Sequence, residues 1–427
     1  MKQIHDVIIA GAGCSGVITA ARLHELAPDW SIALVDKEVR PGGRLLSSSR
    51  HENVWTLGLN TMSPALCEWL DQALKANPDA DDLPGFVRGQ RRRLGVLSAG
   101  DISEVTIDDV LDKKAGRAIA GAAAARDWSL VDELVARAQE GKKTDQPLGQ
   151  SWGGTRKSPS AIALEHLARL WGIPDMWTVS NEVILQRAQE FQQTIMIGDW
   201  DQALSAVLSR AIDSQFLQTF FETRILGADY QDDVWTLATT KGSLQGKRLV
   251  VAQNPWDALL WLPKNHWPSR LVTIPGKAKP SSAVLLTDEI TTASEKEIPD
   301  VILIPAENVQ VIVEQGKSIC FQATLTFELT LQAPAVVKAV KRLRRARKKL
   351  MAVYPDLQLE GDHLALVPVA WSQPIAPADR RMLEKLEIDK HQASHLVFCG
   401  DAYGPALHAE QNLMSSVRSA CESLRKN

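Results

Sequence analysis

The chain has 427 residues, of which 45% are hydrophobic and 23% are charged, and its formal net charge is −3. This composition is typical of a globular protein large enough for two domains, and it excludes a disordered or fibrous chain. Because neither a membrane-spanning apolar stretch nor a secretory leader is visible, we expect a cytoplasmic protein without a transmembrane segment. The net charge gives no reason to expect nucleic acid as a partner.

The cysteines are scattered and odd in number. None of them forms a CxxC spacing, so neither a disulfide framework nor a metal site is predicted. We expect reduced thiols, most of them buried. They are Cys14, Cys67, Cys320, Cys399 and Cys421.

The first motif follows directly on a short apolar run. Residues 7–10 predict a buried parallel strand, and a predicted helix covers residues 17–26. Between them the chain reads Gly11-x-Gly13-x-x-Gly16. In such a loop the first glycine permits a tight turn, the second lets a pyrophosphate approach the backbone, and the third lets the helix pack on the strand. The helix N-terminus then offers N–H groups to phosphate oxygens.

An acidic residue and a second glycine pair come next. The predicted strand over residues 31–36 ends in Asp36, where a carboxylate can bind a ribose hydroxyl. The following turn contains Gly42, Gly43 and Arg44. Two glycines allow the backbone to cross close to another group, and an arginine pairs with phosphate in a fork geometry. The second loop therefore predicts a second anion contact.

The order of these motifs resembles the FAD-binding flavoproteins of the amine oxidase and renalase-like group. The resemblance implies FAD as the cofactor, a second loop folded back over the pyrophosphate, and a later turn beside the isoalloxazine. Without the resemblance, residues 54–74 predict only a strand, a turn and a helix. The cofactor-binding residues that it implies in this part of the chain are Gly11, Gly13, Cys14, Ser15, Gly16, Asp36, Lys37, Gly43, Arg44, Gly58, Asn60 and Thr61.

Residues 84–197 match no motif. Residues 101–140 predict an alanine-rich helical stretch, and Ser158-Pro159 predicts the start of a helix that ends at Gly172. We expect this block to belong to a substrate domain and to set specificity.

Beyond this block the pattern resembles the flavoprotein group again. Strands are predicted over residues 221–226, 234–240 and 247–252, as a meander that returns to the parallel sheet. In the related group the first of these runs passes the adenine, which implies Ile225 as a cofactor neighbour.

Short strand patterns then predict a mainly antiparallel sheet that forms the floor of a substrate cavity. Many amine oxidases of the group place a lysine near the flavin, and Lys277 and Lys279 precede the first of these strands, but that strand resembles the renalase-like pattern, which has no such lysine. The patterns cover residues 282–287, 301–304, 308–313, 318–323 and 325–331.

A basic helix is predicted over residues 336–354. Apolar side chains such as Leu343 and Leu350 fall near one face, and lysines and arginines cover the rest. We favour a solvated amphipathic helix over a membrane or partner surface.

The last motif is a strand over residues 396–399 followed by Gly400-Asp401 and a helix from about Glu410. In the related group this segment returns to the flavin, and the helix dipole stabilises negative charge on it. The resemblance implies cofactor contacts from Gly400, Asp401, Glu410, Gln411 and Asn412. The group's usual Glu-Gly-Ala is Glu410-Gln411-Asn412 here, followed by a matching Ser415, which indicates altered redox tuning or a weakened site.

Two residues are candidates on the substrate side. Trp371 lies where the group often has an aromatic residue near the flavin, and His408 lies in the flavin-facing loop. Core packing and helix capping are the alternatives for them.

We therefore expect an α/β fold with a Rossmann-type FAD-binding domain (1–83, 198–268 and 372–427) and a discontinuous mixed α+β substrate domain (84–197 and 269–371). The expected function is hydride transfer from a small substrate (an amine, an amino acid or a dihydronicotinamide) to flavin, which oxygen reoxidises. One alternative is a flavin-binding accessory or maturation protein that meets another macromolecule through the 84–197 insertion or the basic helix near 338–349. A lipid desaturase-like flavoenzyme is the third option.

Overall fold

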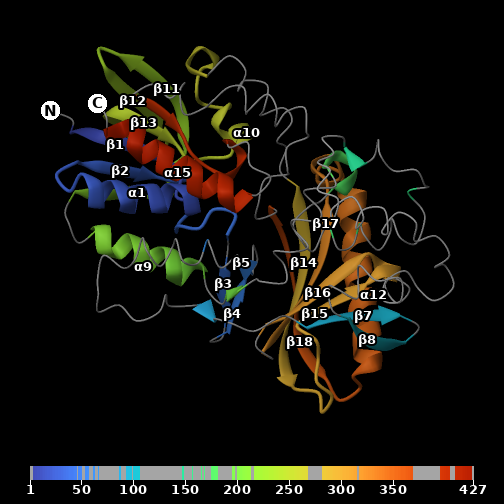
Figure 1. The fold of residues 1–427 in the computed structure, drawn as a ribbon. Helices are drawn as coiled ribbons and strands as arrows, with labels where there is room; N and C mark the ends of the chain where they lie inside the picture. The colour runs from blue at the N-terminus through green and yellow to red at the C-terminus, as the bar shows by residue number, and fades with distance from the viewer. Residues whose placement is uncertain are drawn as a thin grey trace, which may run out of the picture.

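Two large sheets dominate the fold (Figure 1). The computed structural model describes residues 3–45, 47–50, 53–56, 61–62, 66, 86–87, 93–98, 100–105, 147–148, 156, 165, 168, 175–180, 195–197, 200–212, 216–267, 281–314, 317–368, 395–403 and 409–425. Among these residues, no helix combines the length and the apolar character needed to cross a bilayer.

The first sheet has seven strands in the order β10-β2-β1-β13-β12-β11, with β19 paired to β13. Strands β10, β2, β1, β13 and β19 run parallel, whereas β11, β12 and β13 form an antiparallel meander. The central strands are apolar throughout, as expected for a parallel sheet that is buried on both faces. The strands are β1 (Ile4–Ala10), β2 (Ile32–Val35), β10 (Leu217–Phe220), β11 (Ile225–Gln231), β12 (Val234–Thr239), β13 (Gly242–Val251) and β19 (Leu396–Phe398).

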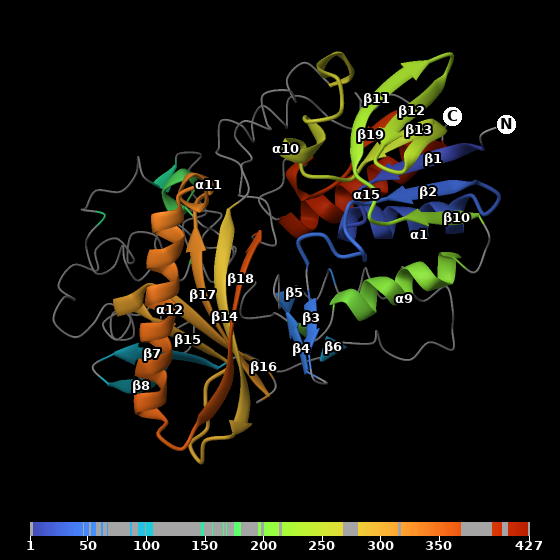
Figure 2. The ribbon, with the colours of Figure 1, turned by 180° about the vertical axis from the view of Figure 1, so that it is seen from behind.

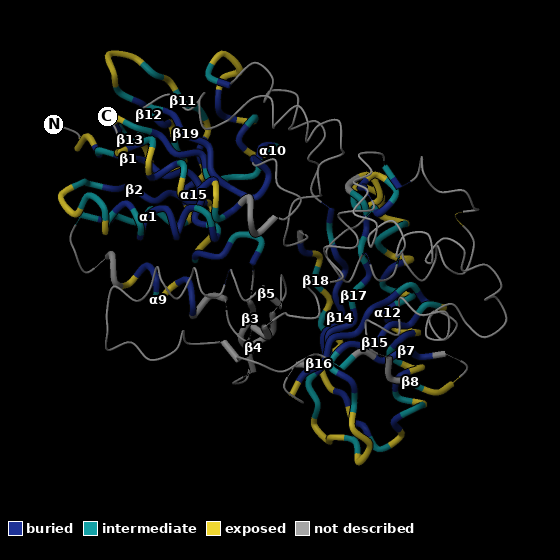
Figure 3. The backbone as a smooth tube through the Cα atoms, viewed as in Figure 1, coloured by how far each residue is buried: buried dark blue, intermediate teal, exposed yellow. Residues whose placement is uncertain are grey.

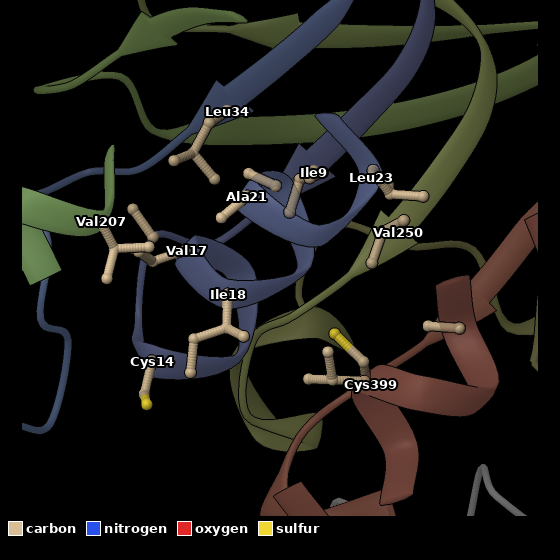
Figure 4. Packing of buried hydrophobic residues seen from close by; sticks show 14 of the residues in the cluster. Ile9, Cys14, Val17, Ile18, Ala21, Leu23, Leu34, Val207, Val250 and Cys399 are labelled. Carbon is tan, nitrogen blue, oxygen red and sulfur yellow. The ribbon is translucent and has the colours of Figure 1, made fainter. Parts of the chain in front are cut away.

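Three helices cover one face of this sheet: α1 (Cys14–Leu26), α9 (Trp200–Ile212) and α15 (Ala409–Arg425). Figure 4 shows Val17 and Ile18 of α1 between the strands and the neighbouring helices. On the opposite face, strand residues such as Trp235 form a core cluster with Tyr403 and with the short helix α10 (Pro255–Ala258). The Rossmann-type sheet predicted from the motifs is confirmed.

The second sheet has the order β18-β14-β17-β16-β15-β7-β8 and is antiparallel except for the β15–β7 pair. Its core lies between the sheet and the long helix α12 (Ala333–Val353), which Figure 2 shows on one face. The mainly antiparallel sheet predicted from the strand patterns is confirmed. The strands are β7 (Leu94–Ser98), β8 (Asp101–Val105), β14 (Ser282–Thr292), β15 (Val301–Ile304), β16 (Val309–Glu314), β17 (Ser318–Leu325) and β18 (Gln358–Pro368).

Smaller elements complete the described chain. A two-stranded sheet joins β3 (Ser47–Arg50) to β4 (Asn53–Thr56), and a three-stranded sheet joins β5 (Thr61–Met62), β9 (Ile195–Ile197) and β6 (Phe86–Val87). Figure 1 shows both between the large sheets. The short helical turns are η1 (Met176–Thr178), η2 (Lys264–His266), η4 (Pro305–Glu307), α11 (Phe327–Thr330) and η5 (Asp401–Tyr403).

Helix α12 is the predicted amphipathic helix, but part of its basic face binds carboxylates of the sheet side. Arg347 donates to the fully buried Asp288, and Arg345 and Lys349 both donate to Glu307. These contacts anchor the helix on the sheet, because an unpaired buried carboxylate would be costly. Figure 3 shows the buried residues running along the strands of each sheet, which is the pattern of one core per sheet.

Two predicted strands are wrong in whole or in part. The run over residues 221–226 is broken, because Glu222 has φ 53° and lies in the left-handed region, so that β11 starts only at Ile225. The run over residues 325–331 turns into α11, where the backbone N–H of Thr330 donates to the carbonyl of Thr326.

The predicted helical stretch over residues 101–140 is wrong at its start. Residues 101–105 form β8, which pairs with β7 through a turn at Gly100, where φ is +88°. Pairing with a sheet edge outweighs local helix propensity here. The remaining residues up to 140 lie outside the described part of the chain. Of the helix predicted from Ser158, the structure describes Glu165 and Ala168, and both are helical.

Candidate cofactor site

The first glycine loop connects β1 to α1 and depends on two close backbone approaches. Gly11 has φ +109°, a conformation that favours glycine. A Cβ atom on Gly16 would lie 1.8 Å from the carbonyl oxygen of Gly11. A Cβ atom on Gly13, in contrast, would meet no protein atom within 4 Å. The glycines therefore differ in role, since Gly11 and Gly16 serve packing, whereas Gly13 leaves space beside the backbone.

Helix α1 starts inside this loop, three residues earlier than predicted. Gly13 is its N-cap residue and provides no side-chain cap, and the first turn contains no acidic residue. The predicted cofactor residues Cys14 and Ser15 are in that first turn. The N–H groups of a first helical turn and the positive end of the helix dipole make such a terminus suitable for an anion.

Asp36 follows β2 and holds the glycine loop in place. Its Oδ2 accepts a hydrogen bond of 2.6 Å from the N–H of Ala12, and its Oδ1 accepts one of 2.9 Å from the N–H of Glu38. The carboxylate is therefore a positioning group as well as a candidate ribose ligand, and the sequence did not predict the bond to Ala12.

The second loop crosses the first one, as predicted. Gly42 forms a parallel bridge with Gly13, and its N–H donates to the carbonyl of Ala12 at 2.9 Å. Gly43 has φ +57°, and a Cβ atom on it would lie 3.1 Å from the Cα of Gly13. Only a residue without a side chain fits this crossing easily.

Arg44, at the end of the second loop, meets the C-terminal segment. Its two terminal nitrogens donate to Asp401 in a fork, at 2.5 Å to Oδ1 and 3.2 Å to Oδ2. The Asp401 side chain is 4% exposed and that of Arg44 is 25% exposed. Arg44 and Asp401 are 357 positions apart in the sequence, and the fold brings them together as an ion pair.

Ser416 of helix α15 holds the C-terminal segment in place, and the sequence did not predict a role for this residue. The hydroxyl of Ser416 accepts a 2.9 Å hydrogen bond from the N–H of Gly400, whose φ is +144°. Ser415, the residue that matches the motif, is exposed. Helical periodicity could have found Ser416, because it lies on the same face as the buried Leu413 and Ala420.

The start of α15 agrees with the prediction. It places Glu410, Gln411 and Asn412 in the first turn, while their side chains lie outside the described part of the structure.

A cavity of about 420 Å³ opens beside the end of β2. Its wall includes Lys37, a predicted cofactor residue, and Arg224, and Ile225 is buried at the start of the neighbouring β11. The N–H of Thr223 donates to the carbonyl of Asp36, and the N–H of Glu222 donates to the carbonyl of Glu38, so that two backbone bonds join the two sides of this wall. The lining residues are Lys37, Glu38, Glu222, Arg224 and Thr240.

One more predicted cofactor residue lies in the described part of the chain. Thr61 lies in β5, paired with Met196 of β9. The other predicted residues lie outside the described residues: Gly58, Asn60, Lys277, Lys279, Trp371 and His408.

The titratable groups beside Gly400 and Asp401 are buried and remain protonated near neutral pH. Burial raises the pKa of the Cys399 thiol to about 12, and burial raises that of the Tyr403 hydroxyl well above its usual value. The Tyr403 hydroxyl donates to the carbonyl of Gln253 at 2.9 Å. Neither group is suited to nucleophilic or proton-transfer chemistry, since each is most stable in its neutral form.

These features fit FAD in three respects. Space beside Gly13 and the N-terminus of α1 suit a pyrophosphate, Asp36 and the cavity suit the adenosine side, and the second loop crosses the first. Within the described residues, no group of three metal-ligating side chains is found.

Comparison with known proteins agrees with this fit. The family model described as FAD dependent oxidoreductase matches residues 6–409. No curated protein matches the chain by sequence.

Solved structures share the fold at low identity. A putative protoporphyrinogen oxidase from Exiguobacterium sp. 255-15 is similar with a TM-score of 0.67 and 14% identity, over 100% of both chains. The cyclohexylamine oxidase from Brevibacterium oxydans IH-35A has a TM-score of 0.68 and 13% identity, over 99% of this chain and 100% of that one. A fatty acid isomerase from P. acnes that produces CLA has a TM-score of 0.64 and 11% identity, over 97% of each chain. The chain therefore belongs to the family of FAD-dependent oxidoreductases, with an amine-oxidase-like fold and FAD as its cofactor.

Proposed function

We propose that the protein oxidises a small organic substrate by hydride transfer to FAD and that molecular oxygen then takes up the electrons, as in amine-oxidase-like or renalase-like enzymes. The observation that carries the proposal is the meeting of three distant segments at one place: the first glycine loop, the second loop and the Gly400–Asp401 segment. An amine, an amino acid or a dihydronicotinamide is the proposed substrate class. The amine named in cyclohexylamine oxidase supports an amine at the level of the fold.

We assign the pyrophosphate to Gly13, to the N–H groups at the start of α1, and to Arg44. An arginine carries five N–H donors in a planar fork, so that it can serve a carboxylate and a phosphate together. Asp401 would then keep Arg44 in its orientation. Because Asp401 is almost fully buried, the pair also joins the C-terminal segment to the second loop.

We assign the adenosine side to Asp36 and to the cavity lined by Lys37 and Arg224. A carboxylate has about four acceptor positions, so a ribose hydroxyl can still donate to Asp36 beside its two backbone partners.

When bound, FAD supplies an acceptor for hydride, so the chain need only bind, orient and keep water from the reacting groups. The neutral Cys399 and Tyr403 are compatible with this, since neither adds a reactive anion near Asp401. Trp371 and His408 remain candidate substrate-side residues.

We also propose the domain division expected from the sequence. Residues 1–83, 198–268 and 372–427 would bind the cofactor, and 84–197 and 269–371 would bind the substrate. A cytoplasmic location and a protein partner for the basic helix remain proposals that the test below does not need.

The test starts with the visible absorption spectrum of the purified protein and with acid release of its cofactor. We expect flavin bands and intact FAD. Anaerobic mixing with benzylamine, with L-amino acids and with NADH should then bleach the flavin with one of the three, and air should restore it.

A matched pair of variants separates cofactor binding from general damage. Arg44→Gln should weaken FAD retention, whereas Arg22→Gln, which breaks an exposed ion pair with Glu25 on the same α1 side of the sheet, should not. Failure of all three reductants to bleach the bound flavin would contradict the proposed reaction, and a stoichiometric protein partner in a pull-down would then favour the accessory function.

A further inference from the structure

The outer side of α12 takes no part in the core or in the candidate cofactor site. Leu343 and Leu350 of this helix pack into the core of the second sheet, and both are fully buried. The other side of the helix faces away from the sheet, and Figure 2 shows α12 on the near side of the sheet with α11 at its upper end. The exposed residues of α12 are Ala333, Pro334, Val337, Lys338, Lys341, Arg344, Arg345, Lys348, Lys349 and Ala352.

Six of these exposed residues are lysines or arginines, and carboxylates offset their charge only in part. Arg344 pairs with Asp362, and Arg345 and Lys349 share Glu307. Since the whole chain has a net charge of −3, the outer side of α12 is a local concentration of positive charge that attracts anions. The other three cations have no carboxylate partner among the residues that the structure describes: Lys338, Lys341 and Lys348.

Four exposed side chains of α12 lie in one stripe along the helix. Val337 is followed by Lys341, Arg344 and Lys348 at steps of four, three and four residues, which is the spacing of neighbours on one helix face. The stripe is about 17 Å long, because each residue adds about 1.5 Å to a helix. A straight row of this kind can present all of its side chains to a flat surface at once.

Three large apolar side chains are exposed where α11 joins α12. Leu331 is 71% exposed, Val337 is 53% exposed and Leu329 is 40% exposed. The carbonyl of Leu329 accepts from the N–H of Gln332, whose own carbonyl accepts from Ala335, so the two leucines lie directly beside the start of α12. The sequence predicts a strand here, and the helical turn that replaces it leaves both leucines at the surface, near the first cations of α12.

We propose that this region binds the surface of an anionic phospholipid bilayer. It is here called the basic surface and consists of the six exposed cations of α12 together with Leu329, Leu331 and Val337. The cations pair with lipid headgroups, and the apolar side chains enter the boundary between headgroups and acyl chains. A nucleic acid fits less well, because the exposed positions of α12 carry no aromatic side chain on which a base could stack.

The first experiment measures sedimentation of the purified full-length protein with vesicles. One set of vesicles is phosphatidylcholine alone, and the other is equal parts of phosphatidylcholine and phosphatidylglycerol. We expect binding to the anionic vesicles in about 0.1 M salt and at least about tenfold weaker binding in about 0.5 M salt, because salt screens the attraction between exposed charges. Binding to phosphatidylcholine alone should be much weaker in both, since its headgroups carry no net charge.

A matched pair of triple variants tests the charge. A lysine near an anionic bilayer strengthens binding about fivefold, so loss of the three unpaired lysines should weaken binding about 100-fold. The control removes the same charge from the part of the chain that holds the first sheet and should stay within about threefold of wild type. The changes are Lys338→Gln, Lys341→Gln and Lys348→Gln in the first variant, and Arg22→Gln, Lys247→Gln and Lys264→Gln in the control.

A second pair tests the apolar contact. Leu331→Ser removes an exposed leucine from the basic surface and should weaken binding to anionic vesicles about tenfold. Leu260, beside α10, is 75% exposed and gives the matched control, so Leu260→Ser should bind as wild type does. Because both leucines are exposed, neither change should lower the thermal midpoint by more than about 1 °C.

Four results would overturn the inference. They are no binding to anionic vesicles in low salt, equally strong binding to phosphatidylcholine alone, equal losses in the two triple variants, and equal losses in the two leucine variants. Binding of double-stranded DNA or poly-L-glutamate without binding of vesicles would overturn it too and would assign the basic surface to a soluble polyanion. Since the measurement needs neither FAD nor turnover, it gives its answer whether or not the proposed reaction occurs.

Discussion

Alanine at Gly13 or at Gly16 should separate cofactor binding from folding. A Cβ atom at position 16 would lie 1.8 Å from the carbonyl oxygen of Gly11, which is backbone and cannot rotate away. At position 13 the new atom would meet nothing within 4 Å, and Gly13 has φ −69°, which alanine adopts without strain. The same added methyl group thus meets the backbone in one variant and open space in the other.

The expected magnitudes follow from these distances. In Gly16→Ala the contact must lengthen by about 1.2 Å to reach 3.0 Å, which moves α1 away from β1 and from the core that they share. Such overpacking costs about 3 kcal/mol. Gly13→Ala should change the free energy of unfolding by less than about 0.5 kcal/mol. Its methyl group occupies the place where the pyrophosphate approaches the backbone, and we expect FAD binding to weaken about 100-fold, or about 2.7 kcal/mol.

The assay combines two measurements on each variant. Denaturant unfolding followed by circular dichroism gives stability, and titration of the apoprotein with FAD, followed by quenching of flavin fluorescence, gives affinity. Near-wild-type FAD affinity in Gly13→Ala, or an unchanged unfolding midpoint in Gly16→Ala, would refute the roles assigned to these glycines.

Three further predictions concern charge and burial. Asp401→Asn weakens a largely buried fork with its arginine partner and should lower stability by about 2 kcal/mol, measured by denaturant unfolding. Burial raises the pKa of Glu307, but hydrogen bonds from Lys349 and Arg345 outweigh burial and hold it below its usual value of 4.5. A pKa that is lower in the folded than in the unfolded state contributes stability that is fully present above the unfolded pKa and is lost as the pH falls through the folded pKa. Glu307→Gln should therefore reduce the loss of unfolding free energy on the acid side of a plot of stability against pH. Because burial raises the pKa of Cys399 to about 12, iodoacetamide at neutral pH should label this residue only after unfolding, as peptide mass spectrometry would show.

Local patterns predicted much of the first sheet and of the cofactor loops. Each of these motifs can be recognised from a few adjacent residues: the glycine motif, the acid at the end of β2 and the second glycine pair. For the glycines this is so because a tight turn or a close backbone approach depends on the local absence of a side chain. The resemblance implied that the second loop folds back towards the pyrophosphate site, and in the structure Gly42 of this loop pairs with Gly13 of the first.

Only the tertiary structure decided the features that depend on residues distant in the sequence. The sequence predicts helix at residues 101–105, where the structure has a strand, because the pairing of these residues with β7 at the sheet edge is not visible in their own sequence. Ser416, rather than Ser415, holds Gly400, because burial against α1 and β19 selects the face of α15.

The contrast is sharpest at Arg44 and Asp401. The sequence by itself determined that each is suited to the cofactor site, through the residue types and their motifs. Only the folded chain brings them to 2.5 Å and makes each the partner of the other. A motif describes what a side chain can bind, whereas the choice of partner depends on distances between segments far apart in the sequence, and these are set by packing of the whole sheet.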